Sequence, residues 1–141
     1  MTDTTASSKP SLLFVCVKNG GKSQMAAGLM AKRAGDNITV DSGGTKPGSA
    51  VNALSAESLA EVGVDISHNT PKAITEDMVR AADVVVTLGR DAQVASVGGT
   101  PVEVWDTDEP SERGIDGVER MRLVRDDIAR RVEELAVELR R

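Results

Sequence analysis

The sequence predicts a doubly wound α/β domain, with a four-stranded parallel sheet and helices on both faces. Short apolar runs typical of buried parallel strands alternate along the chain with segments whose apolar residues recur at three- and four-residue steps. Hydrophobic residues make up 40% of the 141 residues, which is sufficient for one core. We therefore expect one domain over residues 11–141, preceded by a polar, flexible tail over residues 1–10.

Four segments have the character of strands. Residues 11–17 form a continuous apolar run, and residues 38–42 alternate between apolar and polar. Residues 83–88 contain three consecutive valines, and residues 101–105 form a fourth short apolar stretch. Because buried strands of a parallel sheet are covered on both faces, such runs fit the interior of an α/β fold.

Helical periodicity separates these strands. Residues 23–34 carry Met25, Leu29 and Met30 at helical spacing and end before a glycine, which is a common stop signal. Residues 52–62 predict a second helix, and Thr75 is expected to cap a short third one. Residues 118–141 have the apolar spacing of a long amphipathic helix, which follows an acidic, Gly- and Pro-containing loop over residues 106–117.

Composition excludes several classes of function. The formal net charge of −5 argues against nucleic-acid binding, and no apolar run approaches the ~20 residues that cross a membrane. The single cysteine excludes an internal disulfide and suits a reducing compartment, so we expect a cytoplasmic protein without a metal site or a tightly bound cofactor. The one histidine, His68, is interpreted as a structural or exposed loop residue.

The loop between the first strand and the first helix carries the most informative pattern. Two adjacent glycines let the backbone turn with unusual dihedrals, so that successive N–H groups can point into one concave nest. The helix N-terminus and two lysines add positive charge. We expect this loop to bind a tetrahedral oxyanion through Val17, Lys18, Asn19, Gly20, Gly21, Lys22 and Ser23.

Cys16 lies at the rim of this nest and is the candidate nucleophile. Cations and a helix N-terminus favour the ionised sulfur, so we expect a thiolate near neutral pH. Ser23 can donate a hydrogen bond to that sulfur or cap the helix, and Asn19 can hold the loop through its side-chain amide. Taken alone, Cys16 is better interpreted as a small buried apolar residue at a strand end; the glycines, lysines and helix start reverse this in favour of the catalytic interpretation.

A nucleotide-binding loop is the main rival interpretation. The Walker A pattern is G-x-x-x-x-G-K-[ST], and Gly21, Lys22 and Ser23 match its last three positions. Its first glycine, however, is replaced by Cys16, and the strand over residues 83–88 ends before Gly89 rather than an acidic residue. The pattern therefore favours oxyanion chemistry at a thiol.

With these residues in view, the chain resembles the low-molecular-weight protein tyrosine phosphatase superfamily, in its arsenate reductase branch. The resemblance covers nearly the whole chain from Ser11 and implies the α/β fold described above. The matching pieces are Leu13–Cys16, Asn19, Ser23–Ala26, Ser42–Pro47, Val62–Ser67, Ala82–Gly89 and the acidic loop ending in Pro110.

The chain departs from the superfamily pattern at three places. Lys22 stands where the phosphatases have an arginine. A lysine cannot donate the two parallel hydrogen bonds with which an arginine guanidinium binds an oxyanion. Glu109 and Asp108 stand where the phosphatases have an Asp-Pro general acid. Thioredoxin-coupled arsenate reductases carry further cysteines at places held here by Gly21 and the region of Arg90.

The resemblance implies an arsenate-detoxifying enzyme of the arsenate–mycothiol transferase type. Cys16 would attack arsenate with help from Lys22 and Ser23, Glu109 or Asp108 would supply the proton, and Arg90 is a possible auxiliary residue. Because one cysteine cannot supply a second sulfur, an external low-molecular-weight thiol is needed; the resemblance names mycothiol as co-substrate and a mycoredoxin-like glutaredoxin as partner. A phosphatase and a non-catalytic anion-binding module remain the alternatives.

Overall fold

The computed structural model describes residues 9–139 and confirms the predicted fold class. Four parallel strands form one sheet in the order β2-β1-β3-β4. The strands are β1 (Ser11–Cys16), β2 (Thr39–Gly44), β3 (Val84–Leu88) and β4 (Val102–Trp105). Most of the predicted tail over residues 1–10 lies outside the described residues, as do the last two residues of the predicted final helix.

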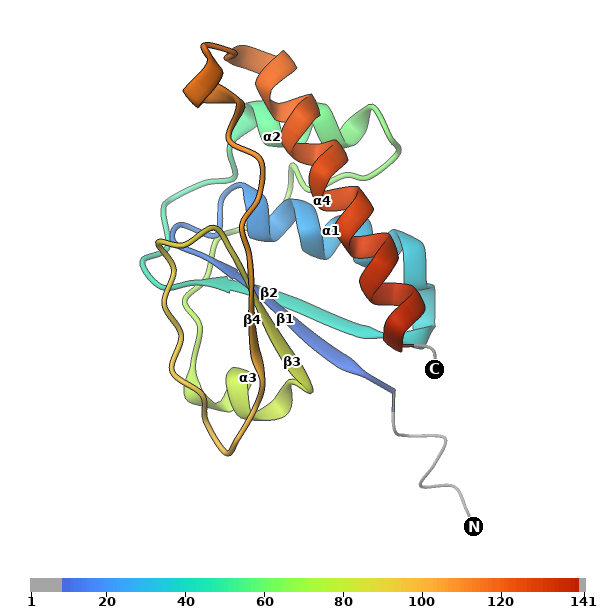
Figure 1. Cartoon of the computed structure of the whole chain (residues 1–141), viewed down its shortest axis with the longest axis vertical. Coiled ribbons are helices and arrows are strands. Elements are labelled where there is room, and N and C mark those ends of the chain that lie inside the picture. Colours follow the sequence, from blue (N-terminus) through green and yellow to red (C-terminus); the bar gives the residue numbers. More distant parts are fainter. Residues whose placement is uncertain (1–8, 140–141) are drawn as a thin grey trace.

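Helices cover both faces of this sheet, as Figure 1 shows. The helices are α1 (Lys22–Ala34), α2 (Ala53–Ala60), α3 (Glu76–Ala81) and α4 (Gly117–Leu139), with short 3₁₀ helices η2 (Gly35–Asn37) and η3 (Pro110–Arg113). Helices α1, α2 and α4 pack together on one face, and α3 lies on the other. The side chain of Thr75 accepts a hydrogen bond from Met78 N and caps α3, as predicted.

The alternation of side chains along β1 supplies both halves of the core. Phe14 and Cys16 point toward the face covered by α1 and α4, while Leu13 and Val15 point toward the face of α3. Phe14 also lies against Trp105 at the end of β4, with ring centroids 5.7 Å apart. A strand that buries both faces must be apolar throughout, which explains the continuous apolar run in the sequence.

The strand order places the loop after β1 at a crevice of the sheet. The chain crosses from β1 to β2 on one side and later to β3 on the other side of β1, so β1 and β3 flank the point where the direction of winding reverses. In open α/β sheets ligands bind beyond the carboxyl ends of strands at such a point. Cys16 is the last residue of β1.

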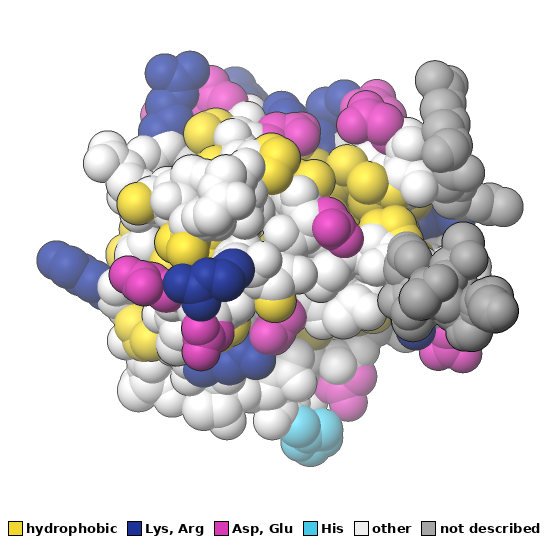
Figure 2. Space-filling model, turned by 90° about the horizontal axis from the view of Figure 1, so that it is seen from below, with side chains coloured by type: hydrophobic (Ala, Val, Ile, Leu, Met, Phe, Trp, Pro, Cys, Tyr) yellow, Lys and Arg dark blue, Asp and Glu magenta, His cyan; other side chains and the backbone are white. Residues whose placement is uncertain are grey.

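The surface carries charges of both signs. On the face shown in Figure 2, acidic and basic side chains are interspersed, and the one histidine projects into solvent, with its side chain 90% exposed. His68 is therefore an exposed loop residue, one of the two interpretations the sequence allowed. None of the helices within residues 9–139 combines the length and apolar character needed to cross a membrane.

An ion-pair cluster joins α2 to α4 and makes stability depend on pH. Glu61 binds Arg122 and Arg125 at 2.6 and 2.8 Å, and these hydrogen bonds lower the pKa of Glu61 from 4.5 to about 2. A carboxylate with a lowered folded-state pKa stabilises the protein above its unfolded pKa, and this contribution is lost as the pH falls through the folded value. We expect the melting temperature of Glu61→Gln to lie below that of the wild type at neutral pH.

The difference between the two melting temperatures should shrink as the pH falls from about 4.5 to about 2, the window between the two pKa values of Glu61. Glu138→Gln, at an exposed position of α4 outside this cluster, is the matched control and should show no such convergence. A gap that stays constant across this window would show that Glu61 does not contribute through its charge.

Candidate active site

The loop after β1 turns its carbonyl groups outward. The carbonyl oxygens of five successive residues accept hydrogen bonds from surrounding groups: Cys16 from Thr45 N, Val17 from Lys46 N, Lys18 from Gly48 N, Asn19 from Gln24 Nε2, and Gly20 from Asn52 N, at 2.6–3.2 Å. Because the C=O and N–H of one trans peptide unit point in opposite directions, the following N–H groups face the inside of the loop. Among residues 9–139, the N–H groups of Gly20 and Gly21 have no acceptor, so they are available to an anion.

The sulfur of Cys16 is surrounded by hydrogen-bond donors at the rim of this nest. Asn19 N donates to Cys16 Sγ at 3.2 Å, and Ser23 Oγ lies 3.0 Å from the same sulfur. Ser23 Oγ accepts a hydrogen bond from Asn19 Nδ2 at 2.8 Å, so its own proton is free to point to the sulfur. These donors are arranged to stabilise a thiolate, and Cys16 is thus more than an apolar residue at a strand end, although it is 8% exposed.

The unusual backbone dihedrals of the loop occur at one of the predicted glycines, Gly21, and also at Asn19, which was not predicted. Asn19, with φ of 54°, is the residue that adopts the left-handed conformation, and neither Gly20 nor Gly21 has a positive φ. Gly20 is needed for close approach instead, because a Cβ there would lie 2.9 Å from Ala50 O. Gly21 has φ of −136° and ψ of −97°, a combination that side chains disfavour, and it caps α1 without a side-chain bond. Ser23 therefore forms a hydrogen bond with the Cys16 sulfur and does not cap α1.

Asn19 is the centre of a buried polar network that the sequence did not reveal in full. Its Nδ2 also donates to Ser42 Oγ at the end of β2, and its Oδ1 accepts from Lys72 N at 3.0 Å. Gln24 Nε2 bonds the carbonyl and side-chain oxygens of Asn19, and Asn69 Nδ2 in turn holds Gln24 Oε1. Gln24 is only 4% exposed. In the sequence, the only sign of its role in this network is an amide side chain directly after Ser23.

The two candidate acids of the acidic loop have different surroundings. Glu109 forms an ion pair with Lys22, which brings the loop before η3 to the start of α1. Asp108 instead binds Arg113 through both oxygens, at 2.8 and 3.2 Å, and this contact lowers the pKa of Asp108. The geometry therefore places Glu109, and not Asp108, beside the anion loop.

The other predicted residues lie at or near the surface. Arg90 binds Asp106 at 2.7 Å, which lowers the pKa of Asp106, and the Arg90 side chain is 77% exposed. Lys18 is exposed and Val17 half-buried, so these two contribute backbone groups to the loop. Within residues 9–139, no group of three or more His, Cys, Asp and Glu side chains is placed to hold a metal ion.

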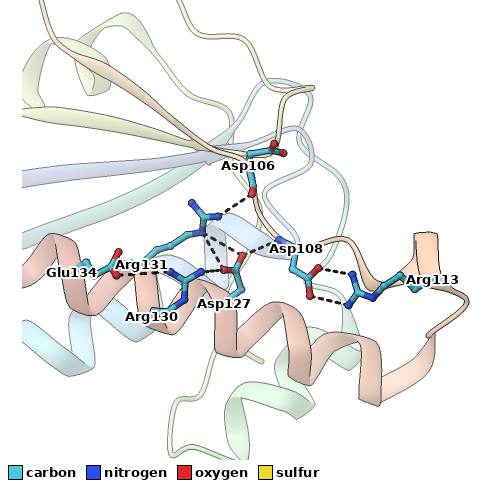
Figure 3. Close-up of polar contacts among 7 residues, drawn as sticks. All are labelled: Asp106, Asp108, Arg113, Asp127, Arg130, Arg131 and Glu134. Carbon is cyan, nitrogen blue, oxygen red and sulfur yellow. Dashed lines mark hydrogen bonds and ion pairs between the residues drawn. The ribbon is translucent and has the colours of Figure 1, made fainter.

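The acidic loop is fastened to α4 by Asp127, as Figure 3 shows. Asp127 Oδ2 accepts from Asp108 N at 2.8 Å, and Arg131, 3.3 Å from Asp127, donates to the Asp106 carbonyl at 3.0 Å. The Asp127 side chain is 10% exposed. In the sequence, Asp127 and Arg131 look like an ordinary i,i+4 pair on a solvated helix face, so their contact with the loop was missed.

A nucleophilic cysteine at the end of β1, followed by a nest of N–H groups and a helix start, defines an oxyanion-binding cysteine enzyme of α/β fold. Residues 11–141 match the family described as low molecular weight phosphotyrosine protein phosphatase, and the chain belongs to this family.

Several relatives have a description narrower than that of the family: they are described as arsenate reductases. "Arsenate reductase 1" of Staphylococcus epidermidis is 38% identical over 132 residues, covering 91% of this chain and 96% of the relative. An arsenate reductase of Bacillus licheniformis is 33% identical over 138 residues, covering 92% of this chain and 96% of the relative.

Solved structures agree with this fold. A thioredoxin-dependent arsenate reductase of Corynebacterium glutamicum has a TM-score of 0.79 and 34% identity; the match covers 96% of this chain but 64% of that protein. A structure described as an arsenate reductase in the phosphate binding state has a TM-score of 0.77 and 29% identity, with 92% and 98% covered.

Proposed function

We propose that this protein transfers arsenic from arsenate to an external low-molecular-weight thiol, with Cys16 as nucleophile. The observation that carries the proposal is the placement of the chain's one cysteine, which accepts hydrogen bonds at the edge of a nest of free N–H groups. The arsenate reductases among its relatives support arsenate as the oxyanion.

In the first step the Cys16 thiolate attacks arsenic, forming an S–As bond. One As–O bond breaks, and the departing oxygen leaves as water after receiving a proton. The oxyanion is held by the loop N–H groups and by Lys22. The arsenate anion competes with the Glu109 carboxylate for Lys22, so its entry releases Lys22 to the anion. Protonated Glu109 is then the general acid for the departing oxygen.

In the second step the external thiol attacks the arsenic. The bond between arsenic and Cys16 breaks, the new S–As bond forms on the external thiol, and the proton of that thiol passes to Glu109. Arsenic is still pentavalent in this adduct. Its reduction needs a second thiol, which attacks the sulfur of the adduct, forms a disulfide and releases trivalent arsenic with the electron pair of the broken bond. A single cysteine in the chain cannot provide that second sulfur.

We assign mycothiol as the external thiol, a mycoredoxin-like glutaredoxin as the second one, and the cytoplasm as their common compartment. The support is the absence of a second cysteine in this sequence, since an internal disulfide relay to thioredoxin needs more than one. The thioredoxin-dependent relative from C. glutamicum makes thioredoxin the principal alternative reductant.

The proposal is tested by arsenate-dependent oxidation of NADPH with three reducing systems supplied separately. These systems contain mycothiol with mycoredoxin, glutathione with glutaredoxin, and thioredoxin with thioredoxin reductase. We expect oxidation with the mycothiol system alone. Activity with thioredoxin alone would replace the external-thiol step by a thioredoxin-coupled one, and activity with none of the three would remove the proposal.

A phosphatase activity is the second candidate, because the family is described by that activity and the nucleophile would be the same. Two features argue against a phosphatase activity. Lys22 replaces the arginine of the phosphatases, and this lysine is paired with Glu109. Strong turnover of p-nitrophenyl phosphate without added thiol would favour the phosphatase. A non-catalytic anion-binding module would bind phosphate or arsenate and show no turnover in either assay.

We expect the hydrogen bond between Asp127 and the acidic loop to affect the rate of the chemical step. Asp127→Ala removes the acceptor for Asp108 N and so loosens the segment that positions Glu109. We expect kcat for arsenate to fall by about tenfold, because misplacing a catalytic group by about 1 Å can cost up to a hundredfold. Thiol KM should stay within about twofold.

The matched control is Asp126→Ala, since Asp126 is the neighbouring exposed aspartate on α4 and binds Arg125 instead. This control should retain wild-type kcat. An equal loss in both variants would attribute the effect to the helix and not to the loop.

A further inference from the structure

A pocket of about 460 Å³ lies beside the anion loop. Gly20, Gly21 and Lys22 form one wall, the start of α2 forms a second, and Arg120 of α4 contributes a third. The same loop residues follow the turn whose N–H binds the Cys16 sulfur. A molecule seated here would therefore touch residues of the anion loop itself.

Arg120 differs from the other arginines of the structure. Eight of the nine arginines within residues 9–139 pair with a carboxylate: Arg33, Arg80, Arg90, Arg113, Arg122, Arg125, Arg130 and Arg131. Arg120 is the ninth, and among the described residues it forms no such pair. Its Nε is buried without a hydrogen-bond partner in the same part of the chain. Because no carboxylate of residues 9–139 pairs with the Arg120 guanidinium, and Arg120 lines this pocket, its donors point to an acceptor from outside the chain.

The chemistry of the pocket indicates what that acceptor is. Its lining contains two lysines, Arg120, serine hydroxyls and Asn52, and it includes no acidic and no aromatic side chain. The side-chain oxygen of Asn52 is already used, since it accepts from Ser55 N and Oγ as the cap of α2. The remaining polar groups are mainly donors, which fits an oxygen-rich ligand and excludes a cationic one.

We propose that this pocket binds the non-reacting part of the thiol co-substrate, with Arg120 donating hydrogen bonds to its oxygen atoms. The inference rests on the proposed function, because it gives the external thiol a place from which to reach arsenic on Cys16. The oxygens could be the hydroxyl and amide groups of a sugar-based thiol such as mycothiol, or the carboxylates of a peptide thiol such as glutathione.

The test separates binding from chemistry by using thiols that cannot react. S-methyl mycothiol and S-methyl glutathione are titrated into the protein by calorimetry, and the Arg120 Nε–Hε resonance is followed by NMR in the wild type. We expect S-methyl mycothiol to shift that resonance, and Arg120→Gln to weaken its binding by about tenfold or more. Phosphate binding to the loop should change by less than about twofold.

Arg122→Gln is the matched control, because Arg122 lies two residues away on α4 and is engaged by Glu61. It should leave thiol binding unchanged. Equal affinity of the wild type and Arg120→Gln, or an unmoved Arg120 resonance in the presence of both methylated thiols, would overturn the pocket assignment. A shift with the glutathione derivative alone would assign the pocket to a carboxylate-bearing thiol. Arg120-dependent binding without arsenate turnover would instead contradict the proposed function and leave the pocket assigned.

Discussion

Cys16→Ser removes arsenate-dependent turnover, with an expected loss of at least about 10³-fold in kcat/KM, because a serine hydroxyl is a far weaker nucleophile without an adjacent base. The serine oxygen can keep the hydrogen bonds that it accepts from Asn19 N and Ser23 Oγ, so the loop should retain its shape. The measurement is arsenate-dependent NADPH oxidation in the reducing system that supports the wild type.

Two further readouts on the same variant identify the cause of the loss. Phosphate, as an unreactive analogue, should bind Cys16→Ser with an affinity within a few-fold of the wild type, and the melting temperature should be unchanged. Loss of phosphate binding would mean that the substitution damages the nest. Retention of turnover would show that the nucleophile is another group, and the proposed mechanism would fail at its first step.

Asn19→Ala should lower both stability and activity, because the asparagine is the buried centre of the loop. Asn19 is fully buried, and its removal leaves Ser42 Oγ and Lys72 N without the partners seen in the structure. We expect the free energy of unfolding to fall by about 2–4 kcal/mol, since the one backbone donor left unpaired, Lys72 N, costs about 1–3 kcal/mol and alanine at positive φ adds about 1 kcal/mol. Urea denaturation followed by circular dichroism measures this change.

Asn19→Gly separates the two contributions. Glycine tolerates the φ of 54° but loses the same side-chain hydrogen bonds, so it should be more stable than the alanine variant by about 1 kcal/mol. Both variants should lose arsenate turnover by at least about tenfold, because Ser23 is no longer oriented toward the sulfur. Wild-type stability in both would show that the buried network contributes little, and equal stabilities would show that the backbone conformation is unstrained.

The parts of the site that are close together in the sequence were predictable. A continuous apolar run covers residues 11–17, and a glycine-containing loop and a helix start follow directly, so Cys16, Ser23 and the nest belong to one local unit. Local patterns of this kind work because strand and helix periodicities, and the hydrogen-bonding needs of a helix start, act over a few residues. The same locality explains why the strands and helices were predicted to within one or two residues.

Contacts between segments that are distant in the sequence were harder to predict from it. The sequence offered both Asp108 and Glu109 as the acid, and only the path of the acidic loop over α4 places Glu109 on Lys22, 87 positions away, while Asp108 binds Arg113. The unusual backbone angles of the loop were expected at the glycines, and Gly21 has them, but Asn19 alone adopts the left-handed conformation; its side chain is held by Ser23, Ser42 and Lys72 N, which lie on three other segments.

The sequence by itself determined the fold class and the thiol at the mouth of an anion loop. Its cysteine count also underlies the proposal that a sulfur from outside the chain takes part in the reaction. The tertiary structure alone decided which acid faces that loop, that Asn19 takes the left-handed conformation, and that Arg120 pairs with no carboxylate of residues 9–139 although the other arginines of α4 in that range are paired. The physical reason is that charge pairing and the burial of polar groups depend on which segments the fold brings together. Apolar periodicity and the composition of a loop, in contrast, are properties of a few neighbouring residues.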